Sequence, residues 1–119
     1  MLATWIRRTL FAAAAVALLG GITSSSTRAA DGPPGYVLQW GTPGALDGEF
    51  DSPHGIAVDS NCDVYVVDTN NDRVQKFDSA GNFLLSWGGT GQAEGEFRHP
   101  IGIAVASNGD VYVVDTGNN

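Results

Sequence analysis

The chain has 119 residues, a formal net charge of −7 and a single cysteine. This length allows one ordinary domain and no more. An acidic surface repels a phosphate backbone, so we expect no nucleic-acid partner. One cysteine excludes an internal disulfide, and the sequence does not determine a role for Cys62.

Residues 1–30 differ in kind from the rest and are predicted to be a signal-peptide helix. Arg7 and Arg8 precede an apolar run over residues 10–22, and small residues follow it up to a cleavage point after Ala29 or Ala30. The apolar run has 13 residues, whereas a helix needs roughly 20 to cross a bilayer. We therefore expect no stable membrane anchor after cleavage. The alternatives for this segment are an uncleaved anchor and a buried apolar helix.

Cleavage there predicts a secreted or periplasmic protein. The general secretion route is favoured, with the twin-arginine route as the alternative because Arg7 and Arg8 are adjacent. Removing residues 1–30 takes away three of the six basic residues and none of the 13 acids, which leaves a net charge of −10.

A short linker, residues 31–35, precedes an internal repeat that covers residues 36–119. Residues 39–72 align without a gap on residues 86–119 with 21 identities in 34 positions, at an offset of 47. Such self-similarity is typical of repeat architectures. The first repeat covers about residues 47–88, and the second covers about residues 94–119 and stops before its second half.

The first repeat contains four segments rich in β-branched and aromatic residues, at residues 55–59, 64–69, 73–78 and 82–87. Short clusters of Asn, Asp, Ser and Gly separate them and predict tight turns. No segment after residue 35 has a helical apolar period. The expected fold is all-β, with each repeat forming a four-stranded antiparallel meander.

The order of motifs resembles the NHL repeat. It runs from Pro-His-Gly-Ile-Ala-Val-Asp at residues 53–59, through Asp-Val-Tyr-Val-Val-Asp-Thr at 63–69, to Asn-Asp-Arg-Val-Gln-Lys-Phe at 71–77. This resemblance implies β-propeller blades, and rings of several blades are usual. Residues 36–41 resemble the last strand of a blade, so about 1.5 blades are present and the ring is incomplete.

Several repeated residues have a structural interpretation. Asp68 and its counterpart Asp115 end the second strand of each repeat, and Arg73 is expected to pair with Asp68 inside the blade. Trp40 and Trp87 recur in register, which predicts packing between blades.

Two positions depart from the repeat. Cys62 stands where the second repeat has Gly109, in a turn that favours a positive φ, and Asp59 is replaced by Ala106.

His54 is the weak candidate for a metal ligand. Its position resembles a metal-binding histidine of the propeller-type peptidyl-hydroxyglycine lyases, but the second repeat has Ile101 there. A zinc site needs three or four converging ligands, so a turn histidine is the favoured interpretation. No cofactor is predicted, and a divalent metal is conceivable only in a complete ring.

The sequence shows no nucleophile elbow and no phosphate loop, and the chain is not expected to be an enzyme. We expect a binding or scaffold module for a protein, peptide or glycan, with assembly of several copies as a route to a closed ring. The alternatives are a remnant of a metal-dependent propeller enzyme of the lyase or lactonase type, and a truncated reading frame without independent function.

Overall fold

The computed structural model describes residues 35–118. The chain divides into two units at the junction of Leu38 and Gln39, and the unit that begins at Gln39 carries the strands described below. The predicted signal helix and its cleavage after Ala29 or Ala30 lie outside the described residues. Within residues 35–118, no helix is long and apolar enough to span a bilayer.

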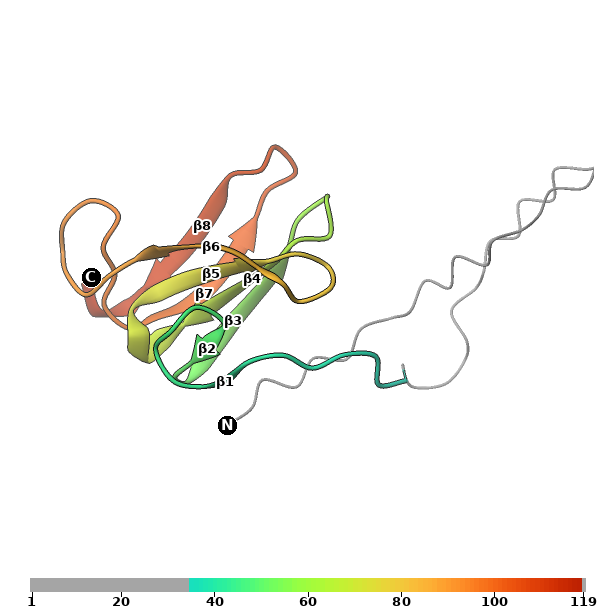
Figure 1. Ribbon diagram of the computed structural model, residues 1–119. Coiled ribbons are helices and arrows are strands. Elements are labelled where there is room, and N and C mark those ends of the chain that lie inside the picture. Colours follow the sequence, from blue (N-terminus) through green and yellow to red (C-terminus); the bar gives the residue numbers. More distant parts are fainter. Residues whose placement is uncertain (1–34, 119) are drawn as a thin grey trace, which may run out of the picture. The chain divides into compact units, whose positions relative to one another are not determined.

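The first repeat forms a four-stranded antiparallel sheet, as predicted from its sequence (Figure 1). Neighbours in the chain are neighbours in the sheet, so the order is that of a meander. Its strands are β3 (Pro53–Val58), β4 (Val64–Asp68), β5 (Arg73–Phe77) and β6 (Phe83–Gly88). The second repeat contributes the antiparallel pair β7 (Pro100–Val105) and β8 (Val111–Asp115), which correspond to β3 and β4. The described residues thus form one complete propeller blade and the first half of another.

Short elements at the strand ends were not predicted from the sequence. Before the first blade, β1 (Thr42–Pro43) pairs in parallel with β2 (Glu49–Phe50), and a single parallel bridge joins Thr90 to Phe97 at the same place before the second. A one-turn 3-10 helix follows the second strand of each repeat, at Thr69–Asn71 and Thr116–Asn118. Both features recur, so they belong to the repeat.

Residues 36–41, which resemble the last strand of a blade, do not form a strand. In the complete blade the corresponding strand β6 pairs along its length with β5. Among the described residues no third strand of a preceding blade exists to supply that pairing. Residues 36–41 therefore have no neighbouring strand among the described residues with which to form backbone hydrogen bonds.

The turns show why these strands begin and end where they do. In the β5–β6 turn, the Asp78 carboxylate accepts hydrogen bonds from the N–H groups of Ala80 and Asn82, at 2.8 and 2.9 Å, and Gly81 has φ +86°. In the β3–β4 turn, Cys62 has φ +66°, and Gly109 has φ +93° in the equivalent β7–β8 turn. Both loops thus need a left-handed residue, which glycine adopts without steric cost.

Alternate residues of β4 point into two separate cores, one on each face of the sheet. Val64 and Val66 belong to a cluster that also contains Phe50 and Phe77. The second cluster contains Tyr65, Val67 and Val74, and partly buried residues of the half blade pack against it: Ile103, Val105, Val111 and Val113. One face of the complete blade is therefore covered by the next blade, and this covering explains the unbroken apolar run in β4.

Candidate functional site

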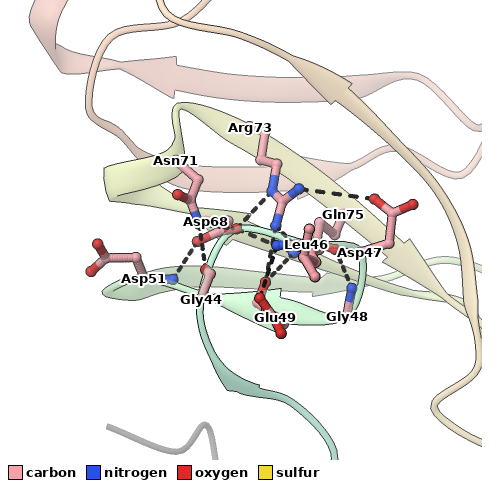
Figure 2. A network of polar contacts seen from close by, with 10 residues as sticks. All are labelled: Gly44, Leu46, Asp47, Gly48, Glu49, Asp51, Asp68, Asn71, Arg73 and Gln75. Carbon is pink, nitrogen blue, oxygen red and sulfur yellow. Dashed lines mark hydrogen bonds and ion pairs between the residues drawn. The ribbon is translucent and has the colours of Figure 1, made fainter.

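The buried carboxylate of Asp68 organises the polar end of the complete blade (Figure 2). Asp68 is fully buried at the end of β4 and accepts the Nε–H of Arg73 at 2.8 Å. Its other donors are the N–H of Asp51 at 2.8 Å, Asn71 Nδ2 at 2.9 Å and Gln75 Nε2 at 3.2 Å. A buried charge is stabilised only where it is paired and hydrogen-bonded, and Asp68 satisfies both conditions.

The donors around Asp68 also hold the loop that precedes the blade, which we call the first leading loop (residues 41–50). Arg73 Nη2 donates to the carbonyl oxygens of Leu46 at 2.8 Å and Glu49 at 3.1 Å. Gln75 donates to the same Glu49 carbonyl at 2.7 Å and accepts the N–H of Gly48 at 2.9 Å. Figure 2 shows the loop wrapped around these side chains. The network is therefore a clamp that fixes the loop on the blade.

The second leading loop (residues 88–97) has the same internal geometry. Ala93 N–H donates to Glu96 Oε2 at 3.0 Å, as Leu46 N–H does to Glu49 Oε2 at 3.0 Å. Asn118 Nδ2 donates to the carbonyl of Gly91 at 2.7 Å, and Asn71 makes the equivalent bond in the first repeat. Two copies of one loop geometry are thus presented by successive blades, and the clamp of Arg73 and Gln75 holds the first of them.

The tips of these loops carry exposed side chains, and the clamp holds the backbone of the first loop. Leu46 is 72% exposed, and the Asp47 side chain is 64% exposed although its carboxylate lies 3.9 Å from Arg73 Nη1. The second loop places Ala93 and Glu94 at the corresponding positions, and both are exposed. An exposed leucine beside a carboxylate on an ordered loop can contact a partner with little loss of conformational entropy.

Asp72 joins the two blades, and the sequence analysis missed it. Its left-handed backbone, φ +51°, follows the 3-10 turn, and its carboxylate accepts Thr90 Oγ1 at 2.6 Å and the N–H of His99 at 2.7 Å. Burial opposes its ionisation, but these two hydrogen bonds lower the pKa of Asp72 below its usual value. An Asn-Asn-Asp sequence after a strand could have signalled such a left-handed cap.

A second charged cluster lies at the opposite end of β4. The Asp59 carboxylate accepts the N–H of Asn61, the N–H of Asp63 and the Tyr65 hydroxyl, while Lys76 Nζ lies 2.8 Å from Asp63 and 3.4 Å from Asp59. The hydrogen bond with Asp63 raises the pKa of Lys76. Burial opposes ionisation of Asp59, but the hydrogen bonds from Asp63 and Tyr65 lower its pKa. The cluster ties three strands together and holds the turn that contains Cys62.

His54 lies at the start of β3, where its Nδ1 is 2.8 Å from the Ser52 carbonyl and 3.1 Å from Thr69 Oγ1. Thr69 in turn donates to the carbonyl of Pro100 in the next blade at 2.7 Å. Within residues 35–118, no three residues of the His, Cys, Asp and Glu types are grouped so that they could hold a metal ion. His54 is thus placed in a hydrogen-bonded chain that links the two blades.

The repeated tryptophans take different neighbours. The Trp40 ring lies 5.8 Å from that of Phe77 in the first core, and the Trp87 ring lies 6.0 Å from that of Tyr65 in the second. Asp115 ends β8 as Asp68 ends β4, but accepts only the N–H of Arg98 and Asn118 Nδ2 among the described residues.

Comparison with known proteins identifies the repeat. Residues 50–77 and 97–119 match the NHL repeat. A stretch of 46 residues is 44% identical to the B-box type zinc finger protein ncl-1 of Caenorhabditis elegans and, over an equal length, to the Protein brain tumor of Drosophila melanogaster. The Protein lin-41 of Caenorhabditis elegans is 48% identical over 48 residues.

These matches cover 39–40% of this chain and 4–5% of the relatives, so the chain corresponds to a small part of each. The meander and its repeated leading loops define a repeat protein built from propeller blades. Two stretches of this chain are thus NHL repeats, as the order of motifs predicted.

Proposed function

We propose that this chain is a binding module whose ligand is a protein, contacted by the tips of the two leading loops. Peptides and glycans are the other ligand classes that such loops can serve. The observation that carries the proposal is the exposure of Leu46 on a loop that the Asp68 network holds in place. An exposed leucine on a loop held in this way can bury apolar surface against a partner with little loss of conformational entropy.

The charge of the module favours a particular kind of partner. Asp47 and Glu94 stand at equivalent loop positions, and removal of residues 1–30 would leave a net charge of −10. Charge complementarity raises association rates and selects against acidic partners. The proposed partner therefore presents an apolar side chain flanked by basic residues.

The full chain should be screened against a displayed peptide library and a glycan array, and hits should be measured by fluorescence anisotropy. We expect peptide hits whose binding is weakened at least about 5-fold by Leu46→Ala and by Asp47→Asn. Leu84→Ala is the matched control, because Leu84 is an exposed leucine on β6, 47% accessible, and should leave binding unchanged. Glycan hits alone, or peptide hits that ignore both loop variants, would rule out this proposal.

The proposed site of action is outside the cytoplasm, since residues 1–30 have the layout of a signal peptide. Expression of the full chain in a secreting host should release a product whose first residue is Ala30 or Asp31, determined by N-terminal sequencing. Retention of the chain in the cell fraction with its first 30 residues intact would contradict export.

A further inference from the structure

The β7–β8 turn contains the one Asn-Gly pair of the sequence, Asn108-Gly109, and both residues are exposed. In such a pair the backbone nitrogen of the glycine can attack the side-chain amide carbon of the asparagine, because no Cβ on the glycine obstructs the approach. The attack closes a five-membered succinimide ring and releases ammonia. The turn therefore holds the reactants of a covalent modification that needs no enzyme.

Hydrogen bonds hold the Asn108 side chain over the backbone that follows it. Its Oδ1 accepts the N–H of Asp110 at 3.1 Å, and its Nδ2 donates to Asp110 Oδ2 at 2.8 Å. A hydrogen bond from an asparagine side chain to the N–H two residues later forms an Asx turn. This turn lays the Asn108 amide carbon alongside the Gly109 nitrogen, and these are the two atoms that must join.

The hydrogen bonds of the Asx turn also suit the chemistry of the attack. Negative charge develops on Asn108 Oδ1 as the tetrahedral intermediate forms, and the Asp110 N–H already donates to that atom. Donors that are in place before such charge develops stabilise the transition state. The Gly109 N–H donates to the carbonyl oxygen of Ala106 at 2.9 Å, so this bond opens before hydroxide removes the proton.

The β3–β4 turn is a matched control within the same chain, because Asn61 occupies the repeat position of Asn108. In this turn the N–H of Asp63 donates to Asp59 Oδ1 at 2.9 Å, and the second repeat has alanine in place of that aspartate. Within residues 35–118 the side chain of Asn61 makes no hydrogen bond. The residue after it is Cys62, whose Cβ crowds the attacking nitrogen. The first turn thus lacks both the Asx turn and the glycine.

We propose that Asn108 converts spontaneously to aspartyl and isoaspartyl residues in the folded chain, whereas Asn61 stays intact. The Gly109 nitrogen loses its proton and bonds to Asn108 Cγ, the Cγ–Nδ2 bond breaks, and the amide nitrogen leaves as ammonia. Water then opens the succinimide ring. Cleavage of the new bond to Cγ leaves an aspartyl residue, and cleavage of the original main-chain bond leaves an isoaspartyl residue.

Both products change the turn. Each replaces the amide that donates to Asp110 with a carboxylate, so a hydrogen bond is exchanged for repulsion between like charges. The isoaspartyl product also adds a methylene carbon to the main chain. The turn lies next to the pairing of Val105 with Val111, and we expect that end of the β7–β8 pair to open more easily after conversion.

The test follows the full chain in neutral and mildly alkaline buffer by peptide mapping. Mass spectrometry with electron-transfer fragmentation measures the aspartyl and isoaspartyl products at each asparagine. We expect conversion at Asn108 to be at least about 10-fold faster than at Asn61. The rate at Asn108 should rise with pH, because loss of the Gly109 proton precedes the attack. An intact Asn108, or equal rates at the two asparagines, would overturn the proposal.

Two variants separate the Asx turn from the glycine. Ala106→Asp supplies the acceptor that the first turn uses for the equivalent N–H, and should slow conversion at Asn108 roughly 10-fold. Ser107→Ala is the matched control, because Ser107 is an exposed neighbour with no part in the Asx turn, and should leave the rate unchanged. Cys62→Gly gives the first turn an Asn-Gly pair, and Asn61 should still convert more slowly than Asn108.

Circular dichroism establishes that each variant is folded. If Ala106→Asp is folded and converts as fast as the unaltered chain, the Asx turn has no role and the proposal fails. It also fails if Cys62→Gly makes Asn61 convert as fast as Asn108, because the glycine alone would then explain the reaction.

Discussion

β4 and β8 have identical sequences and different environments. All five residues of β4 are buried, whereas residues of β8 alternate between partly buried and exposed. Tyr65 is 7% exposed and its counterpart Tyr112 is 61% exposed. The difference arises because β4 has a neighbour on each edge and a blade packed on its second face, while β8 has one neighbouring strand among those of residues 35–118. Matched substitutions in the two strands therefore measure what tertiary neighbours contribute to one short sequence.

The largest difference is expected for the carboxylates at the ends of the two strands, of which only Asp68 is fully buried. Asp68→Asn removes the charge that pairs with Arg73 and should lower the free energy of unfolding by about 3 kcal/mol, because the arginine is left without its buried partner. Asp115→Asn should cost less than about 1 kcal/mol, since no described cation pairs with it. Urea unfolding followed by circular dichroism measures both. Equal costs would show that the two strands do not differ as described.

The next difference concerns the face between the blades. Val67 is fully buried in the second core, so Val67→Ala should destabilise the chain by about 2 kcal/mol. Val114 occupies the same repeat position with 55% exposure, and Val114→Ala should cost less than about 0.5 kcal/mol. A substantial cost at Val114 would indicate that its face is already covered in solution, for example by a second copy of the chain.

Gly55 and its counterpart Gly102 test how closely the strands β3 and β7 approach each other. A Cβ on Gly55 would lie 2.7 Å from the carbonyl oxygen of Ile101 in β7, so Gly55→Ala should force β3 and β7 apart and cost about 1.5 kcal/mol. The equivalent Gly102 would meet only the Val114 side chain, at 3.1 Å, and Gly102→Ala should cost less. The tryptophan fluorescence of the folded chain is a second readout, because Trp87 packs against the core between the blades.

The β3–β4 and β7–β8 turns should respond in opposite directions to exchange of their left-handed residue. Cys62→Gly should stabilise the chain by up to about 1 kcal/mol, because a non-glycine residue at φ +66° is strained. Gly109→Ala should destabilise it by a similar amount, since Gly109 has φ +93°. No change at either position would mean that the turns relax to other backbone conformations.

Asp59 occupies the repeat position at which the second repeat has Ala106. Its contribution to the free energy of unfolding should depend on pH. Asp59→Ala should cost about 1 kcal/mol at pH 7, because the Asp63 N–H and the Tyr65 hydroxyl lose their acceptor. The pKa of Asp59 is lowered in the folded chain, so its contribution is complete above the unfolded pKa of about 4 and is lost as pH falls further. The variant and the unaltered chain should therefore converge in acid. A difference independent of pH would exclude the charged form of Asp59 as its source.

The strands and the NHL repeat could be predicted from the sequence, because both depend on local pattern. β-branched residues, bounded by Asn, Asp and Gly, place the strands to within one or two residues, and the register of the duplication identifies the repeat unit. The first strand begins earlier than predicted, at Pro53, because this residue pairs with Asp68 across an irregular register. That pairing depends on the partner strand, which no local pattern describes.

The polar sites depended more strongly on the fold. The pairing of Asp68 with Arg73 follows from their positions on adjacent antiparallel strands, so it could be predicted. The role of Asp72 could not, because its partners Thr90 and His99 lie 18 and 27 residues further along the chain and meet it only when two blades stack. The clamp on Leu46 and Glu49 likewise requires the leading loop to fold back across β5.

The sequence by itself determined the all-β class, the four-strand repeat and the positions of its turns, because β propensity and turn geometry act over a few residues. Only the tertiary structure decided which copy of Val-Tyr-Val-Val-Asp is buried. Burial and charge pairing arise from neighbours distant in the chain, and β5 gives them to β4 while no described strand gives them to β8.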